Sequence, residues 1–338
     1  MDNEVINKLS CFIDLHIHLD GSLPMETVKK LLVLNKIEKN YTDDDLKNIL
    51  SVPRVGGNLN DYLKKFDFPV SLLQTPKAIE MAVYDLKEKL KEDGLIYAEI
   101  RFAPQKHMQR GMTIEQCVRA AIRGQEKSSL KSGLILCMMR GDDNHDLNLE
   151  TIEIAKKYLG HGVCGIDLAG AEAQYPTENF KDLFDLVKSY VIPTTIHAGE
   201  AAGPRSVDTA ISFGARRIGH GVRSLESTQT IKSIKDNNIA LELCPTSNLN
   251  TGLFENIEEY PFKGLLNYGF KITINTDNTT VSNTSIRREF RILNNAFNLN
   301  TIMVKNLIMN SVRASFAQPN IRVFCESEIE RQFKELNL

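Results

Sequence analysis

The sequence predicts a single α/β domain with the architecture of a (β/α)8 barrel. Short runs rich in apolar and β-branched residues recur eight times along the 338 residues, and most are followed by an amphipathic stretch typical of a helix. No linker rich in Ser, Gly or Pro divides the chain, so one domain over residues 1–338 is expected. Eight strand–helix units favour a barrel, and a doubly wound sheet is the alternative.

The eight predicted strands follow one another at irregular intervals. They cover residues 11–18, 95–102, 134–140, 163–168, 193–197, 217–220, 239–244 and 271–276. Helical stretches such as 177–190 and 206–213 separate the later strands. The first interval, residues 19–94, is far longer than one crossover helix requires.

The long first interval predicts a helical insertion over about residues 22–92. Its stretches 24–35, 42–50, 59–66 and 75–92 all have the pattern of helices, with Pro24 suited to a first turn and Thr42 to an N-cap. The loops that follow barrel strands open on the catalytic face. We therefore expect the insertion to form a lid over an active site.

Composition and charge exclude several classes of protein. The chain is 42% hydrophobic and 25% charged, with a net charge of −2, which is ordinary for a globular domain and gives no basic footprint for nucleic acid. No apolar run approaches the length that spans a bilayer. The N-terminal MDNEVINKLS lacks the apolar core of a signal peptide, so a cytoplasmic location is expected.

Polar side chains occupy strand positions that an ordinary barrel would fill with apolar ones. His16 and His18 alternate with Leu15 and Ile17, so both histidines share the face opposite the apolar residues. The apolar face must pack on helices, so the polar face must point into the barrel, where unpaired charge is costly. His197, His220 and Asp277 end later strands, and the ends of parallel strands converge at the catalytic face.

Three imidazoles and one carboxylate form a plausible ligand set for a catalytic Zn²⁺, with one position left for water. The candidates are His16, His18, His197 and Asp277. A histidine at a strand end is more often a hydrogen-bonded core residue, and it is the matching set that favours metal. Taken alone, Glu200 would be a solvated loop carboxylate, and His220 a residue of a tight turn.

Other charged residues receive structural roles. Glu99, Asp167 and Glu242 lie within strands and are expected to orient ligands or pair with other buried groups. His107, His145 and His161 stand in polar surroundings and are expected at the surface.

Seven motifs in order resemble the adenosine deaminase family. They are HIHLDGSL (16–23), EIRFAP (99–104), GIDLAGAE (165–172), HAGE (197–200), RIGHG (217–221), CPTSN (244–248) and NTDN (275–278). The similarity extends from about residue 11 to SVRASF (311–316). The resemblance implies a zinc-dependent (β/α)8 barrel enzyme, with a purine nucleoside as its small-molecule substrate.

The resemblance also implies roles for single residues. His16, His18, His197 and Asp277 would hold one Zn²⁺. Glu200 would protonate purine N1, and His220 would orient the attacking water and help take up its proton. The reaction would convert adenosine, and 2′-deoxyadenosine, to the inosine product and ammonia in purine salvage.

Further residues are assigned to the substrate by the same resemblance. Gly170 would donate its N–H to purine N3, and His18 and Asp20 would approach the ribose. Leu59, Leu63 and Phe66 resemble the hydrophobic lid.

One position departs from the family's commonest pattern. Asn278 stands where a second aspartate often contacts purine N7, and its amide can donate without being protonated. The departure leaves the substrate open, with another 6-aminopurine such as adenine or a modified adenosine as the alternative. A non-catalytic adenosine-binding protein on the same barrel is a second alternative, which the complete metal set with Glu200 and His220 disfavours.

Overall fold

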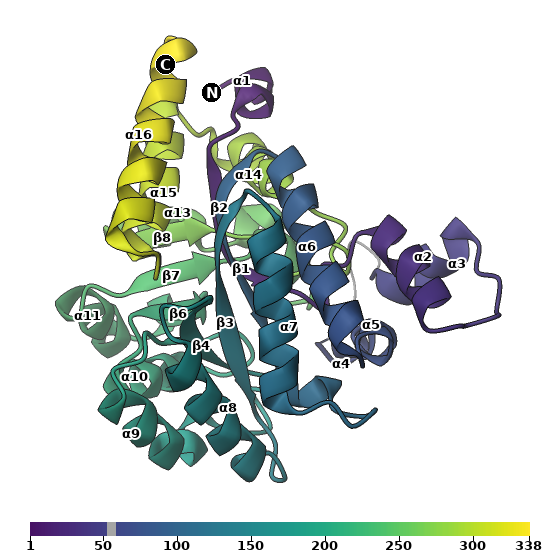
Figure 1. The fold of residues 1–338 in the computed structure, drawn as a ribbon. Helices are drawn as coiled ribbons and strands as arrows, with labels where there is room; N and C mark the ends of the chain where they lie inside the picture. The colour runs from purple at the N-terminus through teal and green to yellow at the C-terminus, as the bar shows by residue number, and fades with distance from the viewer. Residues whose placement is uncertain (53–58) are drawn as a thin grey trace.

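The computed structural model describes residues 1–52 and 59–338, without the side chains of Leu59 and Asn60, and contains a closed ring of parallel strands (Figure 1). Two four-stranded sheets have the orders β1-β2-β3-β4 and β5-β6-β7-β8. Isolated bridges join Ile17 to Asp277 and Ile166 to Thr194, which closes the ring at both seams. The predicted (β/α)8 barrel is therefore confirmed.

The strands lie where the sequence predicts them, with ends shifted by up to three residues. They are β1 (Phe12–His18), β2 (Leu95–Phe102), β3 (Lys131–Met139), β4 (Val163–Ala169), β5 (Thr195–Ala198), β6 (Arg217–His220), β7 (Ala240–Leu243) and β8 (Lys271–Ile274).

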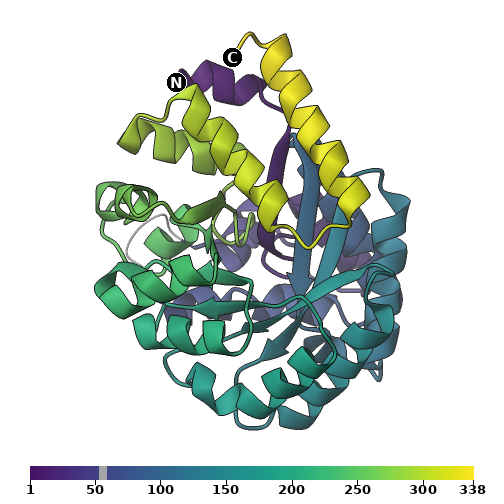
Figure 2. The same cartoon turned by 90° about the vertical axis from the view of Figure 1, so that its left-hand side faces the viewer.

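Helices surround the barrel in both views (Figures 1 and 2). Those after β2 are α7 (Ile114–Lys127), α8 (His145–Tyr158), α9 (Lys181–Ser189), α10 (Pro204–Ser212), α11 (Thr228–Asp236), α12 (Pro245–Asn250), α13 (Phe262–Asn267), α14 (Ile286–Phe297), α15 (Thr301–Ala314) and α16 (Pro319–Glu335). The N-terminal helix α1 (Asn3–Lys8) contacts α14, and both chain ends lie on the same side of the molecule.

The described part of the first interval holds five helices rather than the four predicted. They are α2 (Met25–Leu34), α3 (Asp43–Leu50), α4 (Leu59–Lys64), α5 (Asp67–Leu72) and α6 (Pro76–Glu92). The stretch predicted as one helix over 59–66 ends at Lys64, and α5 begins at Asp67 with Pro69 in its first turn, where the missing N–H costs no hydrogen bond. Figure 1 shows α2 and α3 standing away from the barrel, whereas α6 packs against α7.

The barrel interior is polar and closely paired. Arg101 lies 3.0 Å from Asp167 and 2.9 Å from Glu242, and Arg217 lies 2.6 Å from Glu99 and 2.5 Å from Glu242. We call these five fully buried residues the interior network. The outward-facing strand residues, such as Leu15 and Ile17, are fully buried against the helices.

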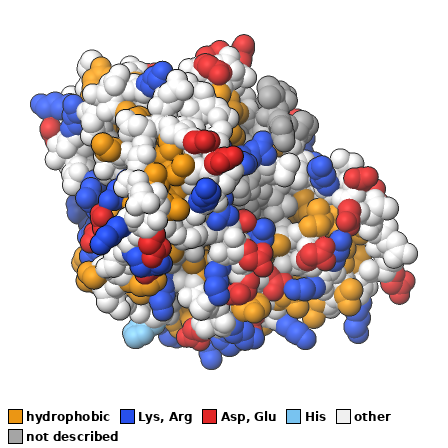
Figure 3. Space-filling model, turned by 90° about the horizontal axis from the view of Figure 1, so that it is seen from above, with side chains coloured by type: hydrophobic (Ala, Val, Ile, Leu, Met, Phe, Trp, Pro, Cys, Tyr) orange, Lys and Arg blue, Asp and Glu red, His pale blue; other side chains and the backbone are white. Residues whose placement is uncertain are grey.

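The surface carries no bias of charge on the face seen in Figure 3, where acidic and basic side chains are interspersed. Within the described residues, we find no helix long and apolar enough to cross a membrane.

Candidate active site

Four histidines and one aspartate meet where the barrel strands end. His16 and His18 come from β1, His197 from β5 and His220 from β6, and Asp277 follows β8. Asp277 Oδ1 lies 3.3 Å from His18 Nε2 and 3.5 Å from His16 Nε2, and the Nε2 atoms of His18 and His197 are 3.3 Å apart. Possible ligand atoms of His16, His197, His220 and Asp277 all lie within 4.8 Å of one another. We call these five residues the mouth cluster.

Two residues of the mouth cluster adopt left-handed backbone conformations. The φ angle is 64° at His220 and 60° at Asp277. Such conformations cost a residue with a Cβ about 1–3 kcal/mol and persist where the surroundings enforce them. The N–H of Asp277 donates to the carbonyl of His16 at 2.8 Å, and the N–H of His18 donates to the carbonyl of Asp277 at 2.7 Å. These bonds tie Asp277 to the seam between β8 and β1.

Carboxylates outside the cluster set the tautomers of two histidines. His16 Nδ1 lies 2.8 Å from Glu242 Oε2, and His197 Nδ1 lies 2.9 Å from Asp167 Oδ2. Each Nδ1–H therefore donates outward, which leaves the Nε2 lone pair facing the cluster. This is the arrangement of metal-binding histidines in proteins. The roles expected for Asp167 and Glu242 match these contacts.

The cluster has the donors that a metal ion requires. His16 Nε2 is fully buried and has no hydrogen-bond partner among the residues that the structure describes. The Nε2 atoms of His18 and His197 lie 3.3 Å apart, close enough for both rings to contact one ion. Neutral imidazoles with one carboxylate suit Zn²⁺ in a catalytic site, so the residues present fit the implied metal.

His220 differs from the other histidines in its outer contact. Asn248 Nδ2 donates to His220 Nδ1 at 3.1 Å, and Tyr260 Oη donates to Asn248 Oδ1 at 3.2 Å, which fixes the orientation of the amide. An accepting Nδ1 places the proton of the neutral ring on Nε2. His220 Nε2 therefore offers an N–H toward the cluster, not a lone pair for a metal.

Asp277 is held by the short helix that follows β7. Ser247 Oγ, in α12, donates to Asp277 Oδ2 at 2.6 Å, so Oδ1 remains free to face the histidines. Burial opposes ionisation of this carboxyl, but the adjacent His16 and His18 outweigh burial and hold the pKa of Asp277 well below its usual range.

Glu200 reaches the cluster from the loop after β5. Its Oε2 lies 3.6 Å from His220 Nε2. The loop is anchored by Glu172, whose carboxylate accepts from the N–H groups of Gly199, Glu200, Ala201 and Ala202 and from Ser206 Oγ. One buried carboxylate thus fixes the backbone that carries Glu200.

Burial and negatively charged neighbours make the carboxyl of Glu200 a weaker acid than that of a free glutamate. Burial first, and then the charges of Asp277 and Glu172, raise its pKa to about 8. Burial lowers the pKa of His220 to about 3. At neutral pH the pair is therefore a protonated acid beside a neutral imidazole.

Gly170 and Asp20 are among the residues predicted to contact the purine and the sugar. Gly170 has φ of 110°, a conformation that favours glycine, at the end of β4. Asp20 Oδ1 lies 3.2 Å from His107 Nε2. The prediction that His107 is at the surface is wrong, because it is fully buried beneath Asp20, whereas His145 and His161 are exposed.

Asn278 and the lid are joined by a hydrogen bond that the sequence does not indicate. Asn278 Nδ2 donates to Tyr62 Oη at 2.9 Å, and Asn278 Oδ1 is buried with no hydrogen-bond partner in the described part of the chain. Tyr62 belongs to α4, and its hydroxyl also lies 2.8 Å from Ser282 Oγ. Asn278, the residue expected to donate to purine N7, is therefore already hydrogen-bonded to the insertion.

The predicted lid residues differ in what the structure describes. The Phe66 ring lies edge-on to His18, with 6.5 Å between ring centroids, and Leu63 is half-buried. The side chain of Leu59 lies outside the described part of the chain. Phe66 thus places the insertion directly over the mouth cluster.

Sequence reasoning assigned no role to four residues that organise this site. They are Tyr62, Glu172, Ser247 and Asn248. Three of them lie inside quoted motifs, GIDLAGAE and CPTSN, and that was the available signal.

Comparisons with known proteins agree on the family. The sequence model described as adenosine deaminase matches residues 12–331. An adenosine deaminase from Haemophilus ducreyi is 46% identical over 336 residues, covering 96% of this chain and 97% of that protein. An adenine deaminase from Arthrobacter aurescens has the same fold, with a TM-score of 0.85 and 24% identity over 96% of this chain and 99% of the other.

A solved amidohydrolase from Burkholderia ambifaria, with bound Zn, also shares the fold at a TM-score of 0.87 and 18% identity, covering 99% of this chain and 93% of the other. The nearly full-length relative and the family model both span the seven motifs, the barrel and the mouth cluster. The chain belongs to the adenosine deaminase family.

Proposed function

We propose that this chain deaminates adenosine, and 2′-deoxyadenosine, by Zn²⁺-dependent hydrolysis to the inosine product and ammonia, as a step of purine salvage. The observation that carries the proposal is the pairing of a protonated Glu200 with His220 beside the mouth cluster. The relative at 46% identity is named for adenosine. The likeness to the adenine deaminase, at 24% identity, is evidence for the fold alone, so the more similar relative favours adenosine over adenine.

The metal is assigned to His16, His18, His197 and Asp277. The orphaned Nε2 of His16 and the opposed Nε2 atoms of His18 and His197 support this set over one that includes His220, whose Nε2 carries a proton. When bound, Zn²⁺ makes hydroxide available near neutral pH.

Glu200 is assigned as the acid for purine N1. Its raised pKa keeps a proton on the carboxyl at pH 7, and donation of this proton to N1 makes C6 more electrophilic. The backbone N–H groups of residues 199–202 donate to Glu172. These bonds fix the loop that positions the carboxyl of Glu200 for this transfer.

His220 is assigned as the group that orients the attacking oxygen. Because Asn248 donates to Nδ1, the neutral ring presents Nε2–H, which suits orientation by donation rather than uptake of a proton. The remaining predicted contacts, Gly170 with N3, Asn278 with N7, and Asp20 and His18 with the ribose, are proposed on position. The insertion, with Phe66 over His18, is proposed to cover the bound nucleoside.

Ultraviolet spectra of metal-loaded protein incubated with adenosine, 2′-deoxyadenosine and adenine test the proposal. We expect the two nucleosides to change to the inosine-type spectrum while adenine does not. Turnover of adenine alone would assign the alternative substrate class. Binding of adenosine without any spectral change would support the non-catalytic reading and contradict ours.

A further inference from the structure

A basic cavity lies at the end of the barrel opposite to the mouth cluster. It has a volume of about 430 Å³ and is lined by residues at the amino-terminal ends of β6, β7 and β8. Four cations line it: Arg216, Lys271, Arg313 and Arg322. We call it the basal cavity.

The topology brings these cations together. Arg217 is paired in register with Ala240, and Ala240 with Lys271, so Arg216 and Lys271 stand on two strands separated only by β7. Neighbouring strands are about 4.8 Å apart. Arg313 lies at the end of α15, which packs on β8, and Arg322 in the first turn of α16.

The positive charge of the basal cavity is not compensated within the described residues. None of the four cations forms an ion pair or side-chain hydrogen bond there, and no Asp or Glu lines the cavity. Burial first, and then the charge of Arg313, lowers the pKa of Lys271. Nearby cations on α15 and α16 are paired, as Lys305 with Glu330 at 2.7 Å and Arg331 with Glu328 at 2.7 Å.

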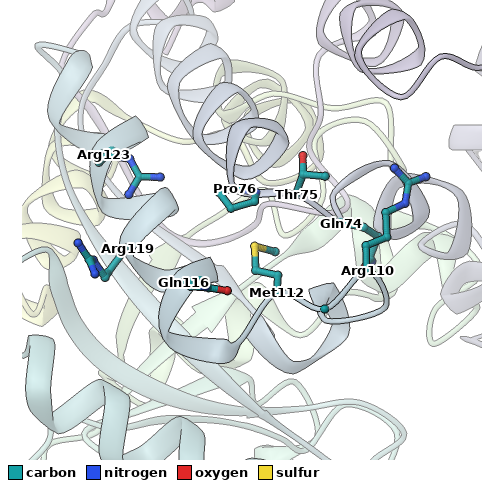
Figure 4. Close-up of a pocket in the computed structure, with 9 residues that line it drawn as sticks. Gln74, Thr75, Pro76, Arg110, Met112, Gln116, Arg119 and Arg123 are labelled. Carbon is teal, nitrogen blue, oxygen red and sulfur yellow. The ribbon is translucent and has the colours of Figure 1, made fainter.

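A second cavity is also lined by arginines, but most of its cations have partners within the protein. It has a volume of about 350 Å³ and lies between the start of α6 and α7 (Figure 4). Arg123 pairs with Glu80 at 2.8 Å, and Arg110 donates to Asn35 at 2.7 Å. Arg119 forms no ion pair or hydrogen bond among the described residues, but its charge acts on the carboxyl of Glu115. Its cations are mostly used by the protein, whereas those of the basal cavity are not.

We propose that the basal cavity binds a phosphate-bearing anion. Arg and Lys are the side chains that recognise phosphate oxygens, and an anion among four unpaired cations removes their mutual repulsion. The volume falls within the range of small-molecule sites. Phe316, half-buried at the edge of the cavity, adds an apolar surface suited to the organic part of a phosphate ester. This site is separate from the proposed deamination site and does not depend on it.

Calorimetric titration of the metal-loaded full chain with inorganic phosphate and with ribose 5-phosphate tests the inference. We expect saturable binding of about one anion per chain, and tighter binding of ribose 5-phosphate if the ligand is an ester. Equal affinities would assign free phosphate. Both results support the site.

Variants locate the bound anion. Lys271→Gln and Arg313→Gln should each weaken binding about 10-fold, equivalent to ~1.4 kcal/mol. Arg119→Gln is the matched control, since it removes one positive charge from the other cavity and should leave the affinity unchanged. Adenosine turnover should be the same in all three. No binding by the parent, unaltered binding by Lys271→Gln and Arg313→Gln, or equal weakening by Arg119→Gln would overturn the inference.

Discussion

The interior network and the mouth cluster occupy one barrel and are both largely buried, yet only the interior network pairs all of its charges with its own residues. In the interior network each guanidinium meets two carboxylates, as Arg101 does with Asp167 and Glu242. In the mouth cluster His16 Nε2 has no hydrogen-bond partner among the described residues, and His18 Nε2 faces His197 Nε2 at 3.3 Å.

The difference separates groups that hold the fold from groups prepared for a ligand. Buried charges are stable when paired, and the interior network meets that condition with its own residues. The mouth cluster meets it only on its outer side, through Glu242, Asp167 and Ser247. Its inner side offers donor atoms that could hold a cation, so incomplete pairing identifies the site where burial alone cannot.

Removal of a proposed ligand should have the largest effect. We expect His197→Ala to lose bound zinc and to lower kcat for adenosine at least ~1000-fold, since a catalytic metal contributes several kcal/mol to the transition state. Elemental analysis and turnover measure both quantities. His145→Ala, which changes an exposed histidine, should retain zinc and activity. Unaltered zinc content in His197→Ala would remove it from the ligand set.

Glu200→Gln should separate chemistry from metal binding. We expect kcat to fall at least ~100-fold, the scale of a positioned general acid, while zinc content is unchanged. Loss of zinc in this variant would instead place Glu200 among the ligands.

The pH dependence of the parent follows from the same group. The pKa of Glu200 is raised to about 8, so the carboxyl is protonated below that pH and loses its proton above it. We expect kcat to fall as pH rises through about 8. In Glu200→Gln the residual rate should not show this decline. A decline of equal size in both would assign the titration to another group.

A matched pair of carboxylates compares the two regions directly. Asp167 contacts both Arg101 and His197, whereas the partners of Glu99 are Arg217, Tyr97 and the backbone of Phe316. Asp167→Asn should weaken zinc binding about 10–100-fold, the usual cost of losing an outer partner of a metal-binding histidine.

Glu99→Gln should lower the free energy of unfolding and leave zinc affinity nearly unchanged. Breaking a buried pair costs about 3–5 kcal/mol, because one charge remains unpaired. Chelator competition and denaturant unfolding provide the two measurements. Equal losses of zinc affinity in both variants would mean that the network and the cluster act as one unit.

The same comparison explains what the sequence could and could not predict. The alternation of His16 and His18 with Leu15 and Ile17 is a local pattern, and local patterns predicted the strands and the inward-facing polar residues. Contacts between distant segments leave no such pattern. Glu172, which anchors the loop of Glu200, has no pattern around it that indicates this contact. The polar residues around His107 in the sequence led to the wrong prediction that His107 is at the surface.

The smallest predicted effect concerns Tyr62, through which the insertion contacts the mouth of the barrel. Its hydroxyl accepts from Asn278 and lies near Ser282, so Tyr62→Phe removes bonds on both sides without emptying the space of the ring. A single hydrogen bond contributes about 1 kcal/mol net, so we expect a change of roughly 3–10-fold in KM for adenosine with kcat and zinc content retained. Tyr41→Phe, in the same insertion but without a hydroxyl partner among the described residues, is the control and should behave as the parent.

The comparison of adenosine with 7-deazaadenosine then shows what Asn278 does. If Tyr62 orients the amide toward N7, Tyr62→Phe should discriminate between the two nucleosides less than the parent does, because the amide is freer to turn. Undiminished discrimination would mean that Tyr62 holds the lid alone and that Asn278 is oriented by the barrel.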